Sequence, residues 1–315
     1  MSRSRSTAGA GGAWRLAFVP LLGLCWGLNW PAVKIMLGEI QPWTLRAGGL
    51  LMSGLLLATI TKLRGDRLAV PPRHWPRLLA AGVLSIAAFS ILLAFAQNAA
   101  PTSRAAIVTY TMPVWAALFA WIVLGEPFDR TRVVGLTLGV AGLAALGWPL
   151  VRDGQLSIGL LYALLGGMSW AAGTVVLKRF PIAAAPMATA AWQLLIGGAC
   201  CTVGMLIVEG VPVPHPLSGA VILSLVFHVL FAQASGYVIW FEVVGRLPAG
   251  ISALGTLMVP AVGVLGAMLF VGERPTIPDY CGLVLIIAAA ASIALPARPV
   301  RAAVPYATGG AASGN

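Results

Sequence analysis

Ten long apolar stretches, each separated from the next by a short run of Gly, Pro or charged residues, dominate this sequence. They cover residues 14–37, 43–61, 76–98, 104–124, 132–151, 157–177, 187–208, 217–243, 249–271 and 279–296. A helix needs about 20 apolar residues to cross the hydrocarbon core of a bilayer, and each stretch is long enough to do so. The sequence therefore predicts an all-α membrane protein with ten transmembrane helices.

The composition agrees with this interpretation and excludes a soluble enzyme. Of the 315 residues, 59% are hydrophobic and only 9% are charged, and the mean hydropathy is +0.91. A soluble domain carries about 25% charged residues, which cover its surface. This chain has too few polar side chains to cover a surface that faces water.

Basic residues are distributed unevenly over the predicted loops. An even number of spans places both termini on one side, and fifteen of the twenty Lys and Arg residues fall there. The other five, Lys34, Arg46, Arg104, Arg152 and Arg274, fall on the opposite side. The positive-inside rule predicts that both termini are cytoplasmic. Orientation then explains the net charge of +11, so this charge does not indicate a nucleic-acid partner.

An internal repeat divides the chain into two halves. Four anchors shift together by 147 residues: Pro101, Pro113, Glu126 and Gly135 recur as Pro248, Pro260, Glu273 and Gly282. Trp26 and Lys34 recur 144 residues later as Trp170 and Lys178. We therefore predict a five-helix repeat at 14–151 and a second at 152–296, flanked by a cytoplasmic tail at 1–13 and a disordered cytoplasmic tail at 297–315.

The odd number of spans in each repeat predicts that the second copy is inverted in the membrane. The loop at 62–77 carries five basic residues and its counterpart at 209–216 carries no Lys or Arg, as expected for opposite sides. Inverted repeats are typical of transporters that work by alternating access and bind their substrate near the membrane midplane.

Three short patterns resemble the EamA family of the drug/metabolite transporter superfamily over about residues 14–296. They are Trp26 followed by Lys34, Pro113 followed by Leu-Gly-Glu126, and Trp192-Gln193-Leu194. Within this family the chain is similar to the YddG-type exporters of aromatic and other amino acids. The resemblance implies a multi-pass exporter of a bacterial-type inner membrane, with a central cavity lined mainly by spans 1, 3, 4, 6, 8 and 9.

Polar and aromatic residues inside those six spans are the candidate cavity residues. Aromatic rings can stack on an apolar substrate or hold a cation, and a polar side chain inside a span faces the bundle interior. The candidates are Trp26, Asn29, Phe89, Ser90, Tyr110, Met112, Trp170, Tyr237, Trp240 and His228. Asn29 either contacts substrate or hydrogen-bonds a neighbouring helix, and both alternatives stay open.

The eighth span carries two polar faces that cannot both look into one cavity. Ser224, His228 and Ser235 share one face, and Gln233, Tyr237 and Trp240 lie about 140–180° away on a regular helix. The family resemblance favours the face of Tyr237 and Trp240. His228 is then expected to hydrogen-bond between helices, with a direct role in binding as the alternative.

Two prolines at equivalent positions of the repeat are candidate hinges. Proline cannot donate to the carbonyl four residues earlier, so Pro113 frees that of Thr109 and Pro260 that of Thr256. We predict a hinge at both positions, and a bend patched by the Thr hydroxyl is the alternative.

We therefore expect a secondary transporter, not an enzyme, that exports amino acids or similar small metabolites, with aromatic and other apolar amino acids favoured. It is expected to act as a monomer in the bilayer without cofactor or metal, since the sequence holds no phosphate-binding loop and no HExxH motif. The alternative cargo is a hydrophobic cation or drug. Less favoured alternatives are a channel and an intramembrane serine hydrolase that uses Ser169 with His228 as its base. The coupling ion stays open.

Overall fold

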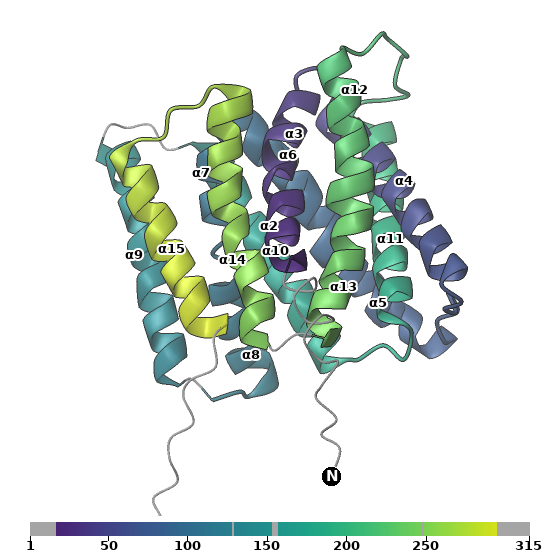
Figure 1. Cartoon of the computed structure of the whole chain (residues 1–315), viewed down its shortest axis with the longest axis horizontal. Coiled ribbons are helices and arrows are strands. Elements are labelled where there is room, and N and C mark those ends of the chain that lie inside the picture. The colour runs from purple at the N-terminus through teal and green to yellow at the C-terminus, as the bar shows by residue number, and fades with distance from the viewer. Residues whose placement is uncertain (1–16, 128, 153–156, 247–248, 295–315) are drawn as a thin grey trace, which may run out of the picture.

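The computed structural model describes residues 17–127, 129–152, 157–246 and 249–294, and every regular element within these ranges is a helix (Figure 1). The α-helices are α2 (Phe18–Gly27), α3 (Asn29–Met36), α4 (Pro42–Leu63), α5 (Trp75–Gly82), α6 (Phe89–Ala99), α7 (Thr102–Thr109), α8 (Met112–Leu124), α9 (Arg130–Arg152), α10 (Ile158–Arg179), α11 (Pro186–Val208), α12 (Gly219–Val226), α13 (Gly236–Arg246), α14 (Ala249–Gly266) and α15 (Ile277–Ala294). A 3-10 turn covers Pro72–His74, and π-helical segments cover Val83–Ala88, Phe227–Ser235 and Ala267–Val271. The tails predicted at 1–13 and 297–315 lie outside the described residues.

Nine helical stretches in the described part of the chain are long and apolar enough to cross a membrane. They are Phe18–Met36, Pro42–Leu63, Pro72–Ala99, Thr102–Leu124, Arg130–Trp148, Ile158–Arg179, Pro186–Val208, Gly219–Trp240 and Ile277–Ala294. A shorter apolar helix, Gly255–Val271, falls within the remaining predicted span. The prediction of an all-helical, multi-pass membrane protein is confirmed.

The helices expose large apolar side chains on the outside of the bundle, and small residues are among those completely buried inside it. Leu55, Ile207 and Leu269 are 60%, 78% and 79% exposed, whereas Ala105 and Ala163 are completely buried. In water such a surface would be unstable, but lipid tails are as apolar as these side chains. The outer surface therefore fits a bilayer.

The helices α4 and α11 pack against each other through a reciprocal pair of contacts. A Cβ atom added to Gly54 would lie 2.9 Å from the Leu195 side chain, and one added to Gly198 would lie 2.8 Å from that of Leu51. Gly54 and Gly198 are 144 residues apart, and so are Leu51 and Leu195. Because residue numbers rise along one helix as they fall along the other, the two helices are antiparallel.

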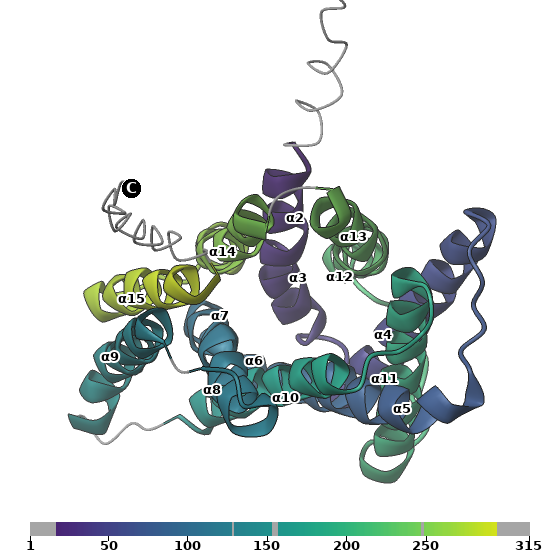
Figure 2. The ribbon, with the colours of Figure 1, turned by 90° about the horizontal axis from the view of Figure 1, so that it is seen from below.

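The helices α9 and α15 form a second reciprocal pair at the opposite end of the bundle (Figure 2). A Cβ atom added to Gly135 would lie 2.6 Å from the side chain of Ile293, and one added to Gly282 would lie 2.5 Å from that of Leu146. Both glycines and both apolar partners are related by the 147-residue shift. These two helices are antiparallel as well.

Two of the predicted spans, the first and the fourth, are interrupted in the middle. The sequence predicts both of them as continuous helices. The first span is interrupted at Leu28 between α2 and α3, where Pro31 has no N–H for the carbonyl of Gly27. The fourth is interrupted between α7 and α8, just before Pro113. By contrast, α14 continues through Pro260. The two candidate hinge prolines therefore occupy different local structures.

Candidate functional site

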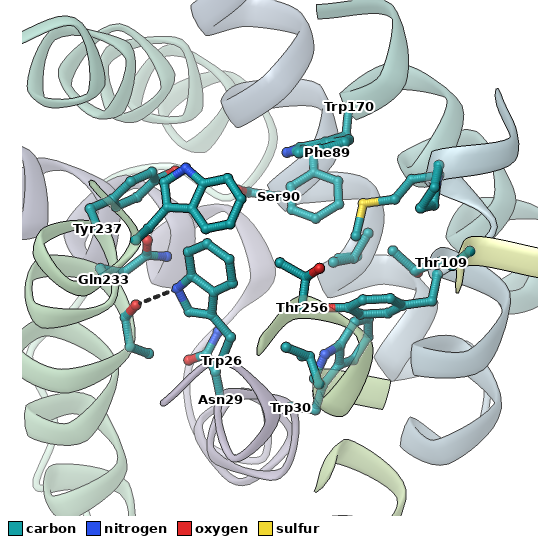
Figure 3. Close-up of a pocket in the computed structure, with 18 of the residues that line it drawn as sticks. Trp26, Asn29, Trp30, Phe89, Ser90, Thr109, Trp170, Gln233, Tyr237 and Thr256 are labelled. Atoms are coloured by element: carbon teal, nitrogen blue, oxygen red, sulfur yellow. Dashed lines mark hydrogen bonds between the residues drawn. The ribbon is translucent and has the colours of Figure 1, made fainter. Parts of the chain in front are cut away.

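A central cavity of about 340 Å³ lies between the two halves of the chain (Figure 3). Side chains from α2, α3, α4, α6, α7, α8, α10, α13, α14 and α15 line it, together with the π-helical segment before α13. Nine of the ten predicted cavity residues are among them, and the exception is His228. The described lining thus comes from all six expected spans, with one residue each added by the second and the tenth, and the role of these residues in binding stays a prediction.

One wall of the cavity is built around Trp26. Its indole Nε1 donates a hydrogen bond of 3.0 Å to the carbonyl of Ala232, drawn as the dashed line in Figure 3. The ring lies edge-on to Tyr237, with centroids 6.2 Å apart, and tilted against Trp240 at 5.7 Å. A Cβ atom on Gly236 would lie only 2.4 Å from the indole Nε1, so only glycine leaves room for this ring position.

The opposite wall comes from α6, α7, α8 and α10. Phe89 and Trp170 lie together on that side in Figure 3, across the space from Trp26. Tyr110 stands at the break between α7 and α8 and is 7% exposed, and Met112 opens α8 beside it. The site is therefore an aromatic enclosure with few polar groups.

Asn29 lines the cavity and also hydrogen-bonds to a neighbouring helix, so both alternatives raised for it fit its position. Its Oδ1 lies 2.7 Å from Nδ1 of His228. The His228 side chain is completely buried, and its Nε2 would lie 3.0 Å from a Cβ atom on Gly49. It packs between α3 and α4, which fits the expected role between helices.

The π-helical segment Phe227–Ser235 explains why the two polar faces of the eighth span could not be placed by helical spacing. A π-helix closes its hydrogen bonds over five residues, so residues before and after it are not related by 100° per residue. Gln233 and Tyr237 line the cavity, whereas His228 within the same segment does not.

Ten further lining residues were neither candidates nor hinges in the sequence-based prediction, and five of them are polar or aromatic: Trp30, Arg46, Thr109, Gln233 and Thr256. Thr109 and Thr256 each stand four residues before a candidate hinge proline, and Gln233 shares a face with Tyr237. These three residues could therefore have been predicted from the sequence. Pro113 lines the cavity too, whereas Pro260 is buried away from it.

Arg46 corrects the charge count of the sequence analysis. We counted it among the basic residues of the outer side, but it lies inside α4, is 4% exposed and lines the cavity. The reason is geometric, since a helix that begins at Pro42 places Arg46 on its second turn. A charge within an apolar stretch was the signal that could have identified it.

A second hollow of about 490 Å³, which we call the vestibule, adjoins the central cavity. Pro113 and Trp170 line both spaces, and the vestibule continues to Glu126, Arg132 and Lys178. Glu126 accepts a hydrogen bond from Lys178 and one of 2.5 Å from Arg132. These two cations hold the pKa of the Glu126 carboxyl below its ordinary value. Figure 1 shows that α8 and α15 end at the same face of the bundle, and the vestibule residues Glu126 and Ile293 lie at the ends of these two helices.

The described lining of the central cavity includes no carboxylate. Glu242, within the predicted span 217–243, forms an ion pair of 3.4 Å with Arg64. In the described residues, no group of three or more His, Cys, Asp and Glu side chains could hold a metal ion. The site therefore offers aromatic surface, a few neutral polar groups and one guanidinium.

The two residues of the hydrolase alternative make hydrogen bonds to other groups. Ser169 Oγ donates to the carbonyl of Leu84 at 2.8 Å, and His228 is paired with Asn29. A serine nucleophile needs its base within hydrogen-bond reach. Nothing in their observed partners supports a catalytic pair.

Comparison with known proteins gives a consistent result. The model of the EamA-like transporter family matches residues 13–148 and 157–295. An uncharacterized transporter of Bacillus subtilis, YvbV, is 30% identical over 86% of this chain and 88% of its own length. A probable amino-acid metabolite efflux pump of Escherichia coli is 26% identical over 85% of this chain and 90% of its own. The uncharacterized inner membrane transporter YedA of Escherichia coli is 26% identical over 91% of this chain and 96% of its own length.

A solved crystal structure has the same fold. It superposes with a TM-score of 0.62 at 22% sequence identity, and the match covers 88% of this chain and 96% of that one.

Proposed function

Because this chain belongs to the EamA-like transporter family, we propose that it exports amino acids or similar small metabolites from the cytoplasm by alternating access. The chain is a multi-pass membrane transporter of the inner, or plasma, membrane. Aromatic and other apolar amino acids are the favoured cargo.

The observation that carries this proposal is the central cavity. Its volume of about 340 Å³ falls in the range of sites for small molecules, about 300–1,000 Å³. Aromatic rings of both halves, Trp26 and Tyr237 on one wall and Phe89 and Trp170 on the other, suit an apolar side chain. One relative, a probable amino-acid metabolite efflux pump of Escherichia coli, supports the same class of cargo.

The reciprocal helix contacts support ten transmembrane helices arranged as two inverted repeats, 14–151 and 152–296. Equivalent helices, α4 with α11 and α9 with α15, meet in antiparallel pairs, and a repeat without inversion would make such pairs parallel. The two stretches matched by the family model fall on either side of the proposed boundary.

With both termini in the cytoplasm, as the distribution of basic residues predicts, the vestibule leads to the cytoplasmic side. The described structure then corresponds to a state that admits cargo from the cell interior. We infer that Pro113 acts as a hinge between this state and an outward-open one, and its presence in the lining of both the cavity and the vestibule supports this role.

Export is proposed to be facilitated by the cargo gradient and performed by a monomer without cofactor. The cavity lining described above lacks the carboxylate that commonly serves as a proton relay inside membranes. A complete cavity is formed within one chain.

Counterflow tests this function. Purified protein is reconstituted into vesicles that are loaded with unlabelled phenylalanine, and uptake of labelled phenylalanine is followed without any ion gradient. A transient overshoot that requires internal phenylalanine is expected. Uptake that never overshoots, whichever amino acid is loaded, would refute amino-acid exchange, and linear non-saturable flux would indicate a channel.

The alternative cargo, a hydrophobic cation, is favoured only by the aromatic walls, since ring faces attract cations. The same assay with a labelled aromatic amine decides between the two. An overshoot with the amine and none with phenylalanine would establish the alternative.

A further inference from the structure

Arg46 is a buried cation whose positive charge has no partner of opposite sign. Its side chain is 4% exposed, and its Nε is fully buried without a hydrogen-bond acceptor. In the described structure, no ion pair or ring contact involves this guanidinium. By contrast, Arg104 near the start of α7 is paired with Asp279 at 2.6 Å.

The side chains close to Arg46 cannot supply the missing negative charge. Its electrostatic neighbours are the imidazole of His228 and the thiol of Cys201. His228 is already bound to the neutral amide of Asn29, and Cys201 is a free, buried cysteine. Neither of them is an acid. An ionised side chain inside a membrane protein is costly unless it is paired or faces a cavity.

Arg46 does face a cavity, and among the described residues that line this cavity it alone carries a formal charge. A guanidinium that is not hydrogen-bonded by the protein can offer its planar fork to a carboxylate in two parallel bonds. The same charge repels a cation that enters the cavity. The aromatic rings of Trp26, Phe89 and Trp170 remain available for an apolar group attached to the carboxylate.

We propose that Arg46 binds the carboxylate of the transported molecule, so that the cavity selects aromatic and apolar carboxylic acids, amino acids among them, over cations. This inference rests on the proposed function, because it takes the central cavity as the transport site. It goes beyond that function by naming the carboxylate as the group that the cargo must carry and Arg46 as the residue that binds it.

Three analogues of one size test this selection on the unmodified protein. Phenylalanine carries both charged groups, 3-phenylpropionate keeps the ring and the carboxylate, and phenethylamine keeps the ring and the ammonium group. We expect 3-phenylpropionate to compete with labelled phenylalanine in counterflow about 10- to 100-fold better than phenethylamine, the usual effect of one hydrogen-bonded charge. Equal or better competition by phenethylamine would overturn the proposal and leave the transporter function standing.

Substitution of the residue provides the second test. Arg46→Gln removes the charge and is expected to weaken the binding of phenylalanine and of 3-phenylpropionate about 10- to 100-fold. Arg46→Lys keeps the charge but not the planar fork of the guanidinium, so we expect an intermediate loss of binding. Arg67→Gln removes the same charge from an exposed loop and serves as the matched control. Unchanged exchange in a folded Arg46→Gln protein would refute the proposal. If that variant does not fold, Arg46→Lys and the analogue series decide.

A binding measurement separates this inference from the proposed function. Each analogue is added to purified protein in detergent and the shift of the thermal midpoint is recorded, since a ligand stabilises the state that binds it. If no solute gives counterflow but 3-phenylpropionate raises the midpoint in the wild type and not in Arg46→Gln, the export function fails and the carboxylate site stands. If no carboxylate raises the midpoint, the carboxylate site fails.

Discussion

Replacing Gly236 by alanine tests the observed position of Trp26 and with it one wall of the cavity. The new Cβ atom would lie 2.4 Å from the indole Nε1, a separation that real Cβ contacts do not reach. The indole must therefore rotate away. It then loses its hydrogen bond to the carbonyl of Ala232 and its edge contact with Tyr237.

The expected size of the effect follows from three contributions. Overpacking a well-filled site costs about 1–3 kcal/mol, and a lost hydrogen bond costs about 0.5–1.5 kcal/mol more. Replacing a glycine inside a helix by alanine stabilises the helix by about 0.5–1 kcal/mol, which offsets part of this cost. The net destabilisation of Gly236→Ala is therefore about 0.5–4 kcal/mol. We also expect a clear loss of phenylalanine exchange, because the ring leaves the cavity wall.

Thermal unfolding in detergent and counterflow in vesicles measure the two effects. Gly48→Ala is the matched control, since a Cβ atom at Gly48, also within a helix, meets nothing within 4 Å. Adding Trp26→Phe to Gly236→Ala should recover part of the stability, because the smaller ring has no atom at the Nε1 position. A Gly236→Ala protein with wild-type midpoint and exchange would show that Trp26 is placed differently.

Three other perturbations test the cavity, the vestibule and the repeat. Trp170→Ala and Tyr110→Ala should each lower exchange at least tenfold while the folded protein still elutes as a single species in gel filtration, and wild-type rates in both would remove these residues from the site. Glu126 has a depressed pKa, so its ion pairs stabilise the protein above the ordinary carboxyl pKa and are lost as the pH falls through the lower, folded-state value. The thermal midpoint should therefore drop on acidification less in Glu126→Gln than in the wild type, and identical pH profiles would contradict this. Gly54→Ala and Gly198→Ala should destabilise by similar amounts, about 1–3 kcal/mol, because each inserts a methyl group into an equivalent contact, and a large difference in midpoint would count against the reciprocal packing.

The sequence was sufficient to predict the helical spans and most of the aromatic cavity residues. Apolar length alone located the spans, and Trp26 and Trp170 were marked by their shift of 144 residues. Apolar length is a local property of the chain and the repeat is a periodic one, so both can be recognised without knowledge of the tertiary packing. The cavity residues that carry no such periodicity, Trp30 for example, needed the structure.

Breaks and π-helical segments account for the rest of what the sequence analysis could not place. The interruptions at Leu28 and just before Pro113 disturb the regular 100° spacing of side chains on two spans for which the sequence predicts continuous helices. The segment Phe227–Ser235 shifts the register between His228 and Tyr237, so spacing rules could not decide which of them faces the cavity. Arg46 was misplaced because a basic residue near a span end is usually taken as a marker of orientation.

In the proposed mechanism Arg46, the one charged residue in the described lining of the cavity, also has a consequence for how the membrane potential acts on export. Arg46 stays with the protein, so the net charge that crosses the membrane in each cycle is that of the cargo alone. A zwitterionic amino acid crosses without electrical work, and only its concentration gradient drives it outward. A cargo with a lone carboxylate moves one negative charge out of a cell that is negative inside, which is favoured by about 2.3 kcal/mol per 100 mV. The same site would thus release amino acids passively and expel simple organic acids against a gradient.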